Sequence, residues 1–193
     1  WIYQVQSNDV RWLQDRNVHI WDEWEIQEDG KWYANQFVME NGELVKKDVV
    51  RDFGLEWAHT IGTAYGWINK KFRNTQRLID TIKNNPCDRR MIMSLWQDDY
   101  IKSAVLPSCV WSSEWDVTDG KLNCWVHQRS CDVPLGLPFN VTQYATLVNL
   151  IAHCTGLEPG KMYWSIKDAH IYVNQVDGIK EQINRYETLE DIS

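Results

Sequence analysis

The residues best suited to chemistry lie in one stretch, 128–140, which reads QRSCDVPLGLPFN. This stretch places an arginine, a serine, a cysteine, an aspartate and an asparagine around a Pro/Gly turn, next to apolar runs. Polar residues at this density beside apolar runs are typical of a site. The alternative is a strand that ends in a turn, with Asn140 serving only as the cap of the next helix.

A second stretch, Leu106 to Cys109, places a cysteine just before a strand-like run. A thiol there lies at the mouth of a sheet, which suits a nucleophile better than a position inside the sheet. The thiolate is the reactive form, and a free thiol with a pKa of about 8.5 is mostly protonated near neutral pH. A nearby guanidinium, such as that of Arg129, would favour the thiolate. A lone cysteine is otherwise more often buried and inert.

Composition narrows the class of protein. The 193 residues are 44% hydrophobic, enough for one substantial core, and predict a single domain over 1–193. The net charge of −7 argues against nucleic acid as the main partner, although a local basic pocket could hold one phosphate. The five cysteines form no CxxC pair, which indicates neither a disulfide framework nor a zinc or other metal site.

The cysteines and the apolar runs also indicate where in the cell the protein is located. Cysteine usage fits a reducing compartment, so we expect a cytoplasmic protein. No apolar run approaches the roughly 20 residues that span a bilayer, and no signal peptide is visible, so we expect no membrane partner.

Periodicity and turn signals predict the order of the elements. Segment 25–62 is polar, with turn signals at Asp29-Gly30 and Asn41-Gly42, and is predicted to be a variable surface insertion. The Asp119-Gly120 pair between two strand patterns predicts a hairpin. Strands and helices mix without βαβ regularity, which favours an α+β fold. The other predicted elements are helical pieces in 1–17, helices over 75–84, 141–153 (the buried core helix) and 175–186, and strands over 91–96, 110–117, 122–127 and 162–173.

Taken together, the motifs resemble those of the thymidylate synthase family in order and spacing. The resemblance covers nearly the whole chain and implies one α+β domain, with a mixed, largely antiparallel sheet packed against a long buried helix. The motifs are Ile20 to Trp24, Ala64-Tyr65-Gly66, Asp88-Arg89-Arg90, Leu106 to Cys109, Gln128 to Asn140, Asp168 to Tyr172 and Asn174 to Gln182.

The resemblance implies reductive methylation of dUMP to dTMP. Carbon 5 of uracil is a poor nucleophile, but a thiolate added to carbon 6 turns the ring into an enolate whose carbon 5 can attack an electrophilic one-carbon unit. The family assigns this thiolate to Cys109, with Arg129 beside it. Tyr65 would help to remove the carbon 5 proton through ordered water. Asn140 would match the ring N–H and the exocyclic oxygen of uracil, and its donor would stabilise the enolate.

The resemblance also implies a nucleotide site shared within a homodimer. Guanidinium forks suit a phosphate dianion, and Arg89 and Arg90 would reach across from the partner subunit, although adjacent arginines by themselves usually form a solvated patch. His170 and Tyr172 would bind the ribose hydroxyl, although a lone histidine is more often structural. The implied substrate-binding residues are Arg89, Arg90, Gln128, Arg129, Ser130, Asp132, Asn140, His170 and Tyr172.

The implied co-substrate is 5,10-methylenetetrahydrofolate, which supplies a one-carbon unit and the hydride that reduces it. Trp21 and Trp24 read by themselves as half-buried aromatics, but the resemblance places them on the wall of the folate pocket, where flat rings can stack on a pterin. Asp132 would meet the pterin. The implied folate-binding residues are Trp21, Trp24, Leu106, Asp132, Gly136 and Phe139.

Two residues depart from the family pattern. Ser108 stands where many members carry a second proline, and Val110 replaces a histidine that often follows the nucleophile. Neither change removes a group that the mechanism requires. The sequence begins at Trp1 and stops at Ser193, and relative to the family we expect an N-terminal part, with a catalytic glutamate and a phosphate-binding arginine, and a C-terminal tail to lie outside it.

Two other functions compete with this interpretation. A dUMP or dCMP hydroxymethylase shares the fold, the thiolate and the folate, but water quenches its intermediate; Asn140 argues against a dCMP enzyme of this kind. An inactive paralogue that binds a nucleotide or RNA is the second alternative. The retention of Cys109, Arg129, Asn140 and His170 argues against it.

Overall fold

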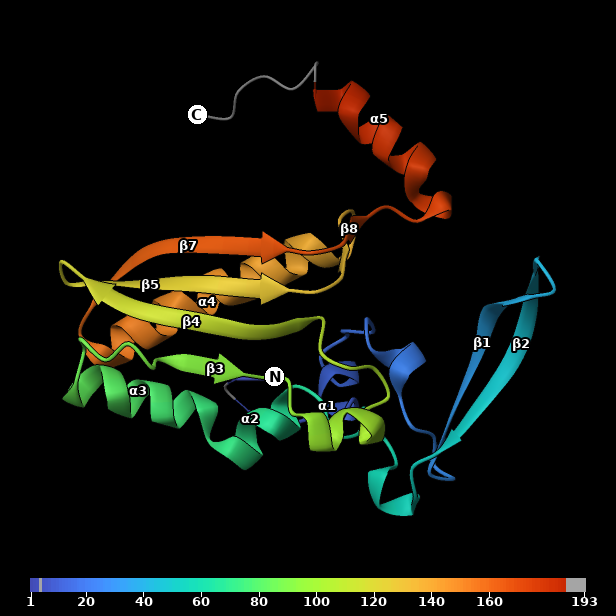
Figure 1. Ribbon diagram of the computed structural model, residues 1–193, viewed down its shortest axis with the longest axis horizontal. Helices are drawn as coiled ribbons and strands as arrows, with labels where there is room; N and C mark the ends of the chain where they lie inside the picture. Colours follow the sequence, from blue (N-terminus) through green and yellow to red (C-terminus); the bar gives the residue numbers. More distant parts are fainter. Residues whose placement is uncertain (4, 187–193) are drawn as a thin grey trace. The chain divides into compact units, whose positions relative to one another are not determined.

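The computed structural model describes residues 1–3 and 5–186 (Figure 1). The chain forms two compact units: unit one comprises Trp1–Leu78 and Met93–Ser108, and unit two comprises Ile79–Ile92 and the described residues from Cys109 onward. Helices and a mixed sheet together confirm the predicted α+β class. No helix in the described part of the chain has the length and apolar character needed to cross a membrane.

Unit one is built mainly of short helices and one long hairpin. Val10, Ile61, Ile68 and Leu95 lie in its core and are almost fully buried. The predicted helical pieces near the start reduce to one short helix, α1. The regular elements of this unit are α1 (Arg11–Gln14), β1 (Lys31–Glu40), β2 (Glu43–Asp52), α2 (Gly66–Phe72), the start of α3 (Asn74–Asn84), and short 3-10 helices at Asp22–Trp24, Leu55–Trp57 and Asp98–Ser103.

Strands β1 and β2 form an antiparallel hairpin in continuous register, from Lys31 opposite Asp52 to Glu40 opposite Glu43. Its turn is the predicted Asn41-Gly42, and both residues have positive φ, of 51° and 86°, as a turn that matches strand twist requires. Segment 25–62 is therefore not only surface. The end of the hairpin opposite its turn belongs to a hydrophobic core, because Trp32 is buried there and packs against Ile26.

The sheet that carries the candidate site has the strand order β3-β4-β5-β7. Strand β4 pairs antiparallel with β5, and β5 pairs parallel with β7. The predicted Asp119-Gly120 turn joins β4 to β5, with φ values of 51° and 74°. A separate parallel pair, β6 and β8, lies beyond the ends of β5 and β7. The strands are β3 (Ile92–Ser94), β4 (Val110–Thr118), β5 (Lys121–Gln128), β6 (Cys131–Asp132), β7 (Glu158–Ile166) and β8 (Ala169–His170).

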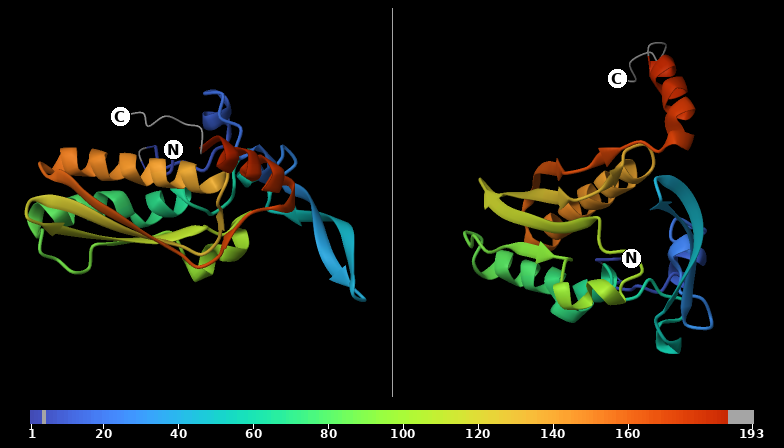
Figure 2. Two further views of the ribbon diagram at one scale, coloured as in Figure 1. Left: turned by 90° about the horizontal axis from the view of Figure 1, so that it is seen from above. Right: turned by 45° about the vertical axis from the view of Figure 1, so that its right-hand side comes forward.

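Helix α4 (Gly136–Thr155) lies along one face of this sheet and contacts β5 and β7 (Figure 2). Tyr144, Leu147, Val148 and Ile151 are buried at i, i+3, i+4 and i+7, while Leu150 is exposed. The helix therefore packs one apolar face on the sheet, as expected for the core helix, and exposes its other face. Gly156 adopts a left-handed conformation after its last turn, as expected for a C-terminal cap.

The remaining elements match the sequence predictions in type but not always in extent. Helix α3 matches the predicted helix over 75–84 closely, and the last helix is α5 (Val176–Tyr186). The predicted strand over 162–173 instead ends at Ile166, and β8 follows after a break. This break turns Asp168 to His170 back beside β6.

We expect Leu122→Ala to lower the free energy of unfolding by about 2 to 5 kcal/mol, because Leu122 is fully buried in β5 and truncation leaves a cavity. Urea unfolding at one fixed protein concentration measures this change. The control is the exposed neighbour Lys121, whose replacement by alanine should shift stability by less than about 0.5 kcal/mol. Equal losses in both variants would contradict the packing described.

Candidate active site

Cys109 and Arg129 meet where β4 begins and β5 ends. Antiparallel pairing places Val110 opposite Gln128. Cys109, which precedes Val110, and Arg129, which follows Gln128, are therefore neighbours. The Arg129 backbone N–H donates to the Cys109 carbonyl oxygen at 2.9 Å, and the Arg129 Nη2 atom lies 3.9 Å from the Cys109 Sγ atom. The sheet therefore brings a permanent positive charge to a thiol at its edge.

Burial separates Cys109 from Cys124 and Cys131, whereas Cys87 and Cys154 of the same unit are exposed. Cys109 is half-buried, whereas Cys124 and Cys131 are buried. Burial raises the pKa of the Cys124 thiol. Burial also raises the pKa of the Cys131 thiol, and the charges of Asp132 and Cys109 add to that effect. Cys109 combines access with an adjacent cation, which is the environment of a nucleophilic cysteine.

Gln128 is almost fully buried and fixes the orientation of the Asn140 side chain. The Trp164 indole can only donate, and its Nε1–H donates to Gln128 Oε1 at 2.9 Å. The Oε1 atom therefore faces Trp164, and the Nε2 group faces the opposite way. Nε2 donates to the Ser130 carbonyl at 2.9 Å and to Asn140 Oδ1 at 3.2 Å. Asn140 is left with its Nδ2 donor and one oxygen lone pair for a ligand.

Asn140 lies inside helix α4, which begins at Gly136. The alternative role of Asn140 as the cap of this helix is therefore wrong, because the cap position falls on Leu135. Gly136 starts the helix close to Asn140: a Cβ built on Gly136 would lie 3.8 Å from Asn140 Oδ1 and 3.6 Å from Asp132 Cβ. Phe139, on the same turn, exposes 46% of its surface.

Asp132 and His170 are brought together by the parallel pair of β6 and β8, in which they are directly opposite. The Val133 backbone N–H donates to the His170 carbonyl at 3.0 Å and holds this register. Tyr172 packs edge-on against the His170 ring, with centroids 5.0 Å apart. Candidate residues from two distant parts of the sequence thus share one end of the sheet.

Gln175 belongs to this group, although the sequence singled it out only as part of the motif 174–182. Its Nε2 donates to both carboxylate oxygens of Asp132, at 3.1 and 2.9 Å, and its Oε1 accepts from the Tyr172 backbone N–H at 2.9 Å. Gln175 therefore connects the segment of Tyr172 to the carboxylate of Asp132.

The candidate residues of unit one form an aromatic group. Trp21 meets Tyr65 edge-on with centroids 5.4 Å apart, and Trp24 stacks on Trp32 at 5.7 Å. Tyr65 is buried and has a φ of +45°, an unusual backbone conformation for a residue with a large side chain. Strained conformations of this kind cluster at functional sites. Both tryptophans are half-buried.

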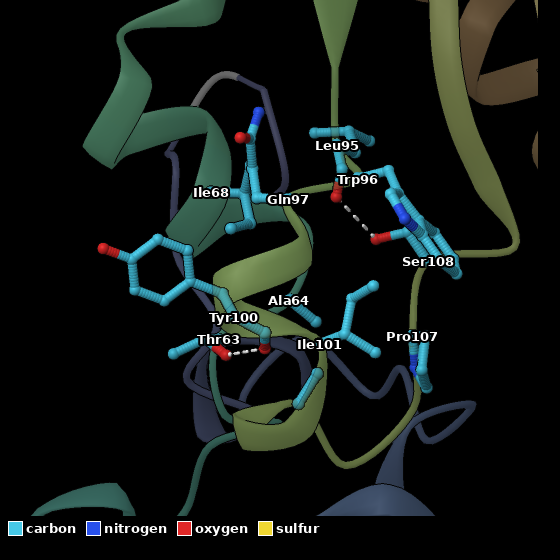
Figure 3. Close-up of a pocket in the computed structure, with 11 residues that line it drawn as sticks. Thr63, Ala64, Ile68, Leu95, Trp96, Gln97, Tyr100, Ile101, Pro107 and Ser108 are labelled. Atoms are coloured by element: carbon cyan, nitrogen blue, oxygen red, sulfur yellow. Dashed lines mark hydrogen bonds between the residues drawn. The ribbon is translucent and has the colours of Figure 1, made fainter.

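The segment before Cys109 is anchored in unit one. Pro107 and Ser108 line a cavity of about 10 Å³, too small for any substrate (Figure 3). Ser108 is buried, and its hydroxyl donates to the Leu95 carbonyl at 3.3 Å. The serine at the position of the family proline thus has a structural partner. Leu106 is half-buried.

Arg89 and Arg90 lie in a different part of unit two, in the loop that follows α3. Arg89 lines a pocket of about 280 Å³ with Glu114, Trp115 and Trp125. This pocket is toward the end of β4 that is farther from Cys109. The structure of one chain therefore groups Cys109, Gln128, Arg129, Ser130, Asp132, Asn140, His170 and Tyr172, and places the adjacent arginines elsewhere on the same unit. Within residues 1–3 and 5–186, no cluster of His, Cys, Asp or Glu side chains is arranged to hold a metal ion.

Comparison with known proteins matches this arrangement to one family. The family model described as thymidylate synthase matches residues 1–191. Thymidylate synthase of Clostridium beijerinckii is 50% identical over 185 residues, which cover 96% of this chain and 59% of that protein. Thymidylate synthase 1 of Bacillus spizizenii is 39% identical over 194 residues, with the same two shares.

A solved structure agrees with these sequence matches. The thermostable thymidylate synthase A from Bacillus subtilis matches with a TM-score of 0.72 and 36% identity, over 95% of this chain and 58% of that one. The chain thus spans about 59% of the length of the first two relatives. Since the family model matches nearly every residue and the fold agrees, the chain belongs to the thymidylate synthase family.

Proposed function

We propose that the protein containing this chain is a thymidylate synthase, which converts dUMP to dTMP with 5,10-methylenetetrahydrofolate. The observation that carries the proposal is the half-buried Cys109 thiol with the Arg129 guanidinium 3.9 Å away, beside an asparagine held in one orientation. The relatives named above are all thymidylate synthases, which favours this function over a hydroxymethylase.

In the proposed mechanism, the Cys109 thiolate attacks carbon 6 of the uracil ring and forms a carbon–sulfur bond. The electron pair of the ring double bond moves toward the carbonyl at carbon 4, where Asn140 Nδ2–H donates to the developing oxyanion. Arg129 stabilises the thiolate before attack. Carbon 5 then becomes the nucleophile, and the proton that it later loses passes toward Tyr65 through ordered water.

Folate would supply the one-carbon unit and the hydride. The chain offers suitable groups for it. Asp132 is a carboxylate held by Gln175 and suits the N–H donors of a pterin. Phe139 presents an exposed ring in the first turn of α4, and the half-buried rings of Trp21 and Trp24 suit stacking. We also assign Leu106 and Gly136 to folate binding.

For the nucleotide, we assign Arg129 and Ser130 to the phosphate, and His170 and Tyr172 to the ribose hydroxyl. Tyr172 is 55% exposed, the half-buried His170 ring packs against it, and the two polar side chains are therefore close enough to bind one hydroxyl group. Gln128 is buried and contacts Asn140, so it acts by orienting that amide toward the base.

We further propose that the enzyme is a cytoplasmic homodimer, in which Arg89 and Arg90 reach the partner's nucleotide. The sheet face opposite α4 carries a row of aromatic rings, Trp111, His127, Trp125 and Tyr163, with successive centroids 5.5, 6.2 and 5.5 Å apart. The three rings other than half-buried His127 are exposed. Exposed apolar faces of this kind mark interaction sites. Both arginines are exposed in the loop before this sheet, and all five cysteines are free, as in a reducing compartment.

Replacing the nucleophile separates binding from chemistry. We expect Cys109→Ser to lose more than about a thousandfold in kcat while the Kd for dUMP changes little, because a hydroxyl of similar size does not ionise near neutral pH. Incubation with 5-fluoro-dUMP and the folate should give an adduct that survives denaturation only in the unsubstituted enzyme. An adduct in the serine variant would refute the assignment, and Cys154→Ser, which alters an exposed cysteine, is the control.

Shared sites predict complementation between inactive subunits. Arg90→Ala and Cys109→Ala should each be nearly inactive alone. Their mixed dimers should recover activity, because one of the two sites then has both residues. The measurement is dTMP formation after subunit exchange, against each variant exchanged with itself. No recovery would show that Arg90 acts within its own subunit or has no role.

Asn140 should decide between uracil and cytosine. Cytosine presents a ring acceptor and an amino donor, so an amide held in one orientation mismatches both groups, at a cost of about 1 to 3 kcal/mol each. Asn140→Asp can accept from the amino group and, when protonated, donate to the ring nitrogen, so preference should move toward dCMP. The measurement is the ratio of kcat/KM for dUMP and dCMP in both proteins. An unchanged ratio would mean that Asn140 does not read the base.

A further inference from the structure

The loop after α3 contains an ion pair that the proposed mechanism does not use. Arg90 Nε donates to Asp88 Oδ1 at 2.9 Å, and Arg90 Nη2 donates to Asp88 Oδ2 at 2.8 Å. The backbone N–H of Arg90 donates to the same Oδ1 at 2.8 Å. One carboxylate thus binds both the backbone and the guanidinium of Arg90, which selects one rotamer of a long side chain.

Asp88 is the fixed member of the pair. Only 11% of its side chain is exposed, whereas 87% of the Arg90 side chain is exposed. Asn85 Nδ2 donates to Asp88 Oδ2 at 3.3 Å, and the Asp88 backbone N–H donates to the Asn85 carbonyl at 3.0 Å. The hydrogen bond from the Arg90 side chain lowers the pKa of Asp88 to about 2, so the carboxylate is charged at any pH suitable for an assay.

The pair uses only one edge of the guanidinium. That group carries five N–H donors in one plane, and the Nε and Nη2 donors on one edge point at Asp88. The other edge, formed by Nη1 and the second Nη2 hydrogen, points away from the carboxylate. One edge is enough for a bidentate contact with a phosphate. A side chain already held in place loses less entropy when it binds.

We propose that Asp88 is a positioning residue for Arg90, and that it presents the outer guanidinium edge to the phosphate of the nucleotide bound by the partner subunit. The inference rests on the proposed function, in which Arg90 reaches across the dimer. The opposite role would be competition, in which Asp88 occupies the donors that the phosphate needs. The exposed outer edge favours positioning.

The chain contains a matched control. Asp9 binds Arg11 with the same pattern: backbone N to Oδ1 at 3.0 Å, Nε to Oδ1 at 3.0 Å and Nη2 to Oδ2 at 2.6 Å. Asp9 lies in unit one and Arg11 has no role in the proposed site. Asp9→Ala therefore removes an ion pair of the same geometry without touching Arg90.

The experiment compares Asp88→Ala, Arg90→Ala, the double variant and Asp9→Ala in the complete dimeric enzyme. We expect Asp88→Ala to raise the KM for dUMP and the inhibition constant of inorganic phosphate by about 3- to 10-fold, with kcat changed less than about twofold. Because Arg90→Ala is expected to be nearly inactive, the Kd for dUMP replaces KM in that background, and adding Asp88→Ala to Arg90→Ala should not change this Kd further. Asp9→Ala should change neither KM nor the inhibition constant. Asp88→Glu should restore part of the affinity.

Each other outcome overturns the inference. A lower KM in Asp88→Ala would show competition, and full additivity with Arg90→Ala would show that Asp88 does not act through Arg90. If Arg90→Ala raises KM and Asp88→Ala does not, the inference fails while the proposed function stands. If Arg90→Ala has no effect, its assignment in the proposed function is wrong as well. Should Asp88→Ala fold poorly, Asp88→Asn removes the charge at nearly constant shape and should raise KM in the same direction.

Discussion

The arrangement of the candidate site depends on the register of β4 against β5 at the end where β4 begins and β5 ends. The backbone hydrogen bond from Arg129 to the Cys109 carbonyl continues this pairing beyond the last strand residues. Since side chains alternate between faces of a sheet, a slip of one residue would move every side chain of β5 to the other face. The contact between the Cys109 thiol and the Arg129 guanidinium therefore depends on the core residues of β5, which hold this register.

Gln128 extends this constraint from the backbone to the Asn140 side chain, which we propose recognises the base. A buried amide must satisfy both of its ends, and here the donor-only indole of Trp164 decides which end is which. The Trp164 indole on β7 sets the orientation of the Gln128 amide, and Gln128 in turn sets the orientation of the Asn140 amide on α4. A polar network of this kind tolerates little change, since loss of one member leaves the next one buried without its partner.

The chain is acidic overall, but two of its arginines, Arg129 and Arg90, provide local positive charge. The net charge of −7 would disfavour a phosphate, yet arginines occur where the proposed mechanism needs them. Arg129 is half-buried and beside a thiol, while Arg90 is exposed and held by Asp88. In the proposed dimer, a guanidinium held along one edge and open along the other suits a phosphate bound by the other subunit.

Elements whose signals are local can be predicted from the amino-acid sequence alone. Alternation and the Asp-Gly pair predict the β4–β5 hairpin, and apolar spacing predicts α3 and α5. The order of motifs also identified the candidate residues, including Cys109 and Arg129. These features depend on neighbours within a few residues, so they can be read without the fold.

The bounds of some elements and the long-range hydrogen bonds of the candidate site are visible only in the folded structure. Helix α4 starts at Gly136 rather than Val141, because Pro138 falls in the first turn, where a missing N–H breaks no hydrogen bond. Strands β1 and β2 contain as many apolar as polar residues, but several of the apolar side chains, such as Phe37 and Leu44, are exposed, and the two strands pair with each other in a separate two-stranded sheet. The partners of Gln128 and Asp132, which are Trp164 and Gln175, lie 36 and 43 residues farther along the chain. Hydrogen bonds over such separations exist only once strands and helices have packed, because nothing in the local sequence brings these groups together.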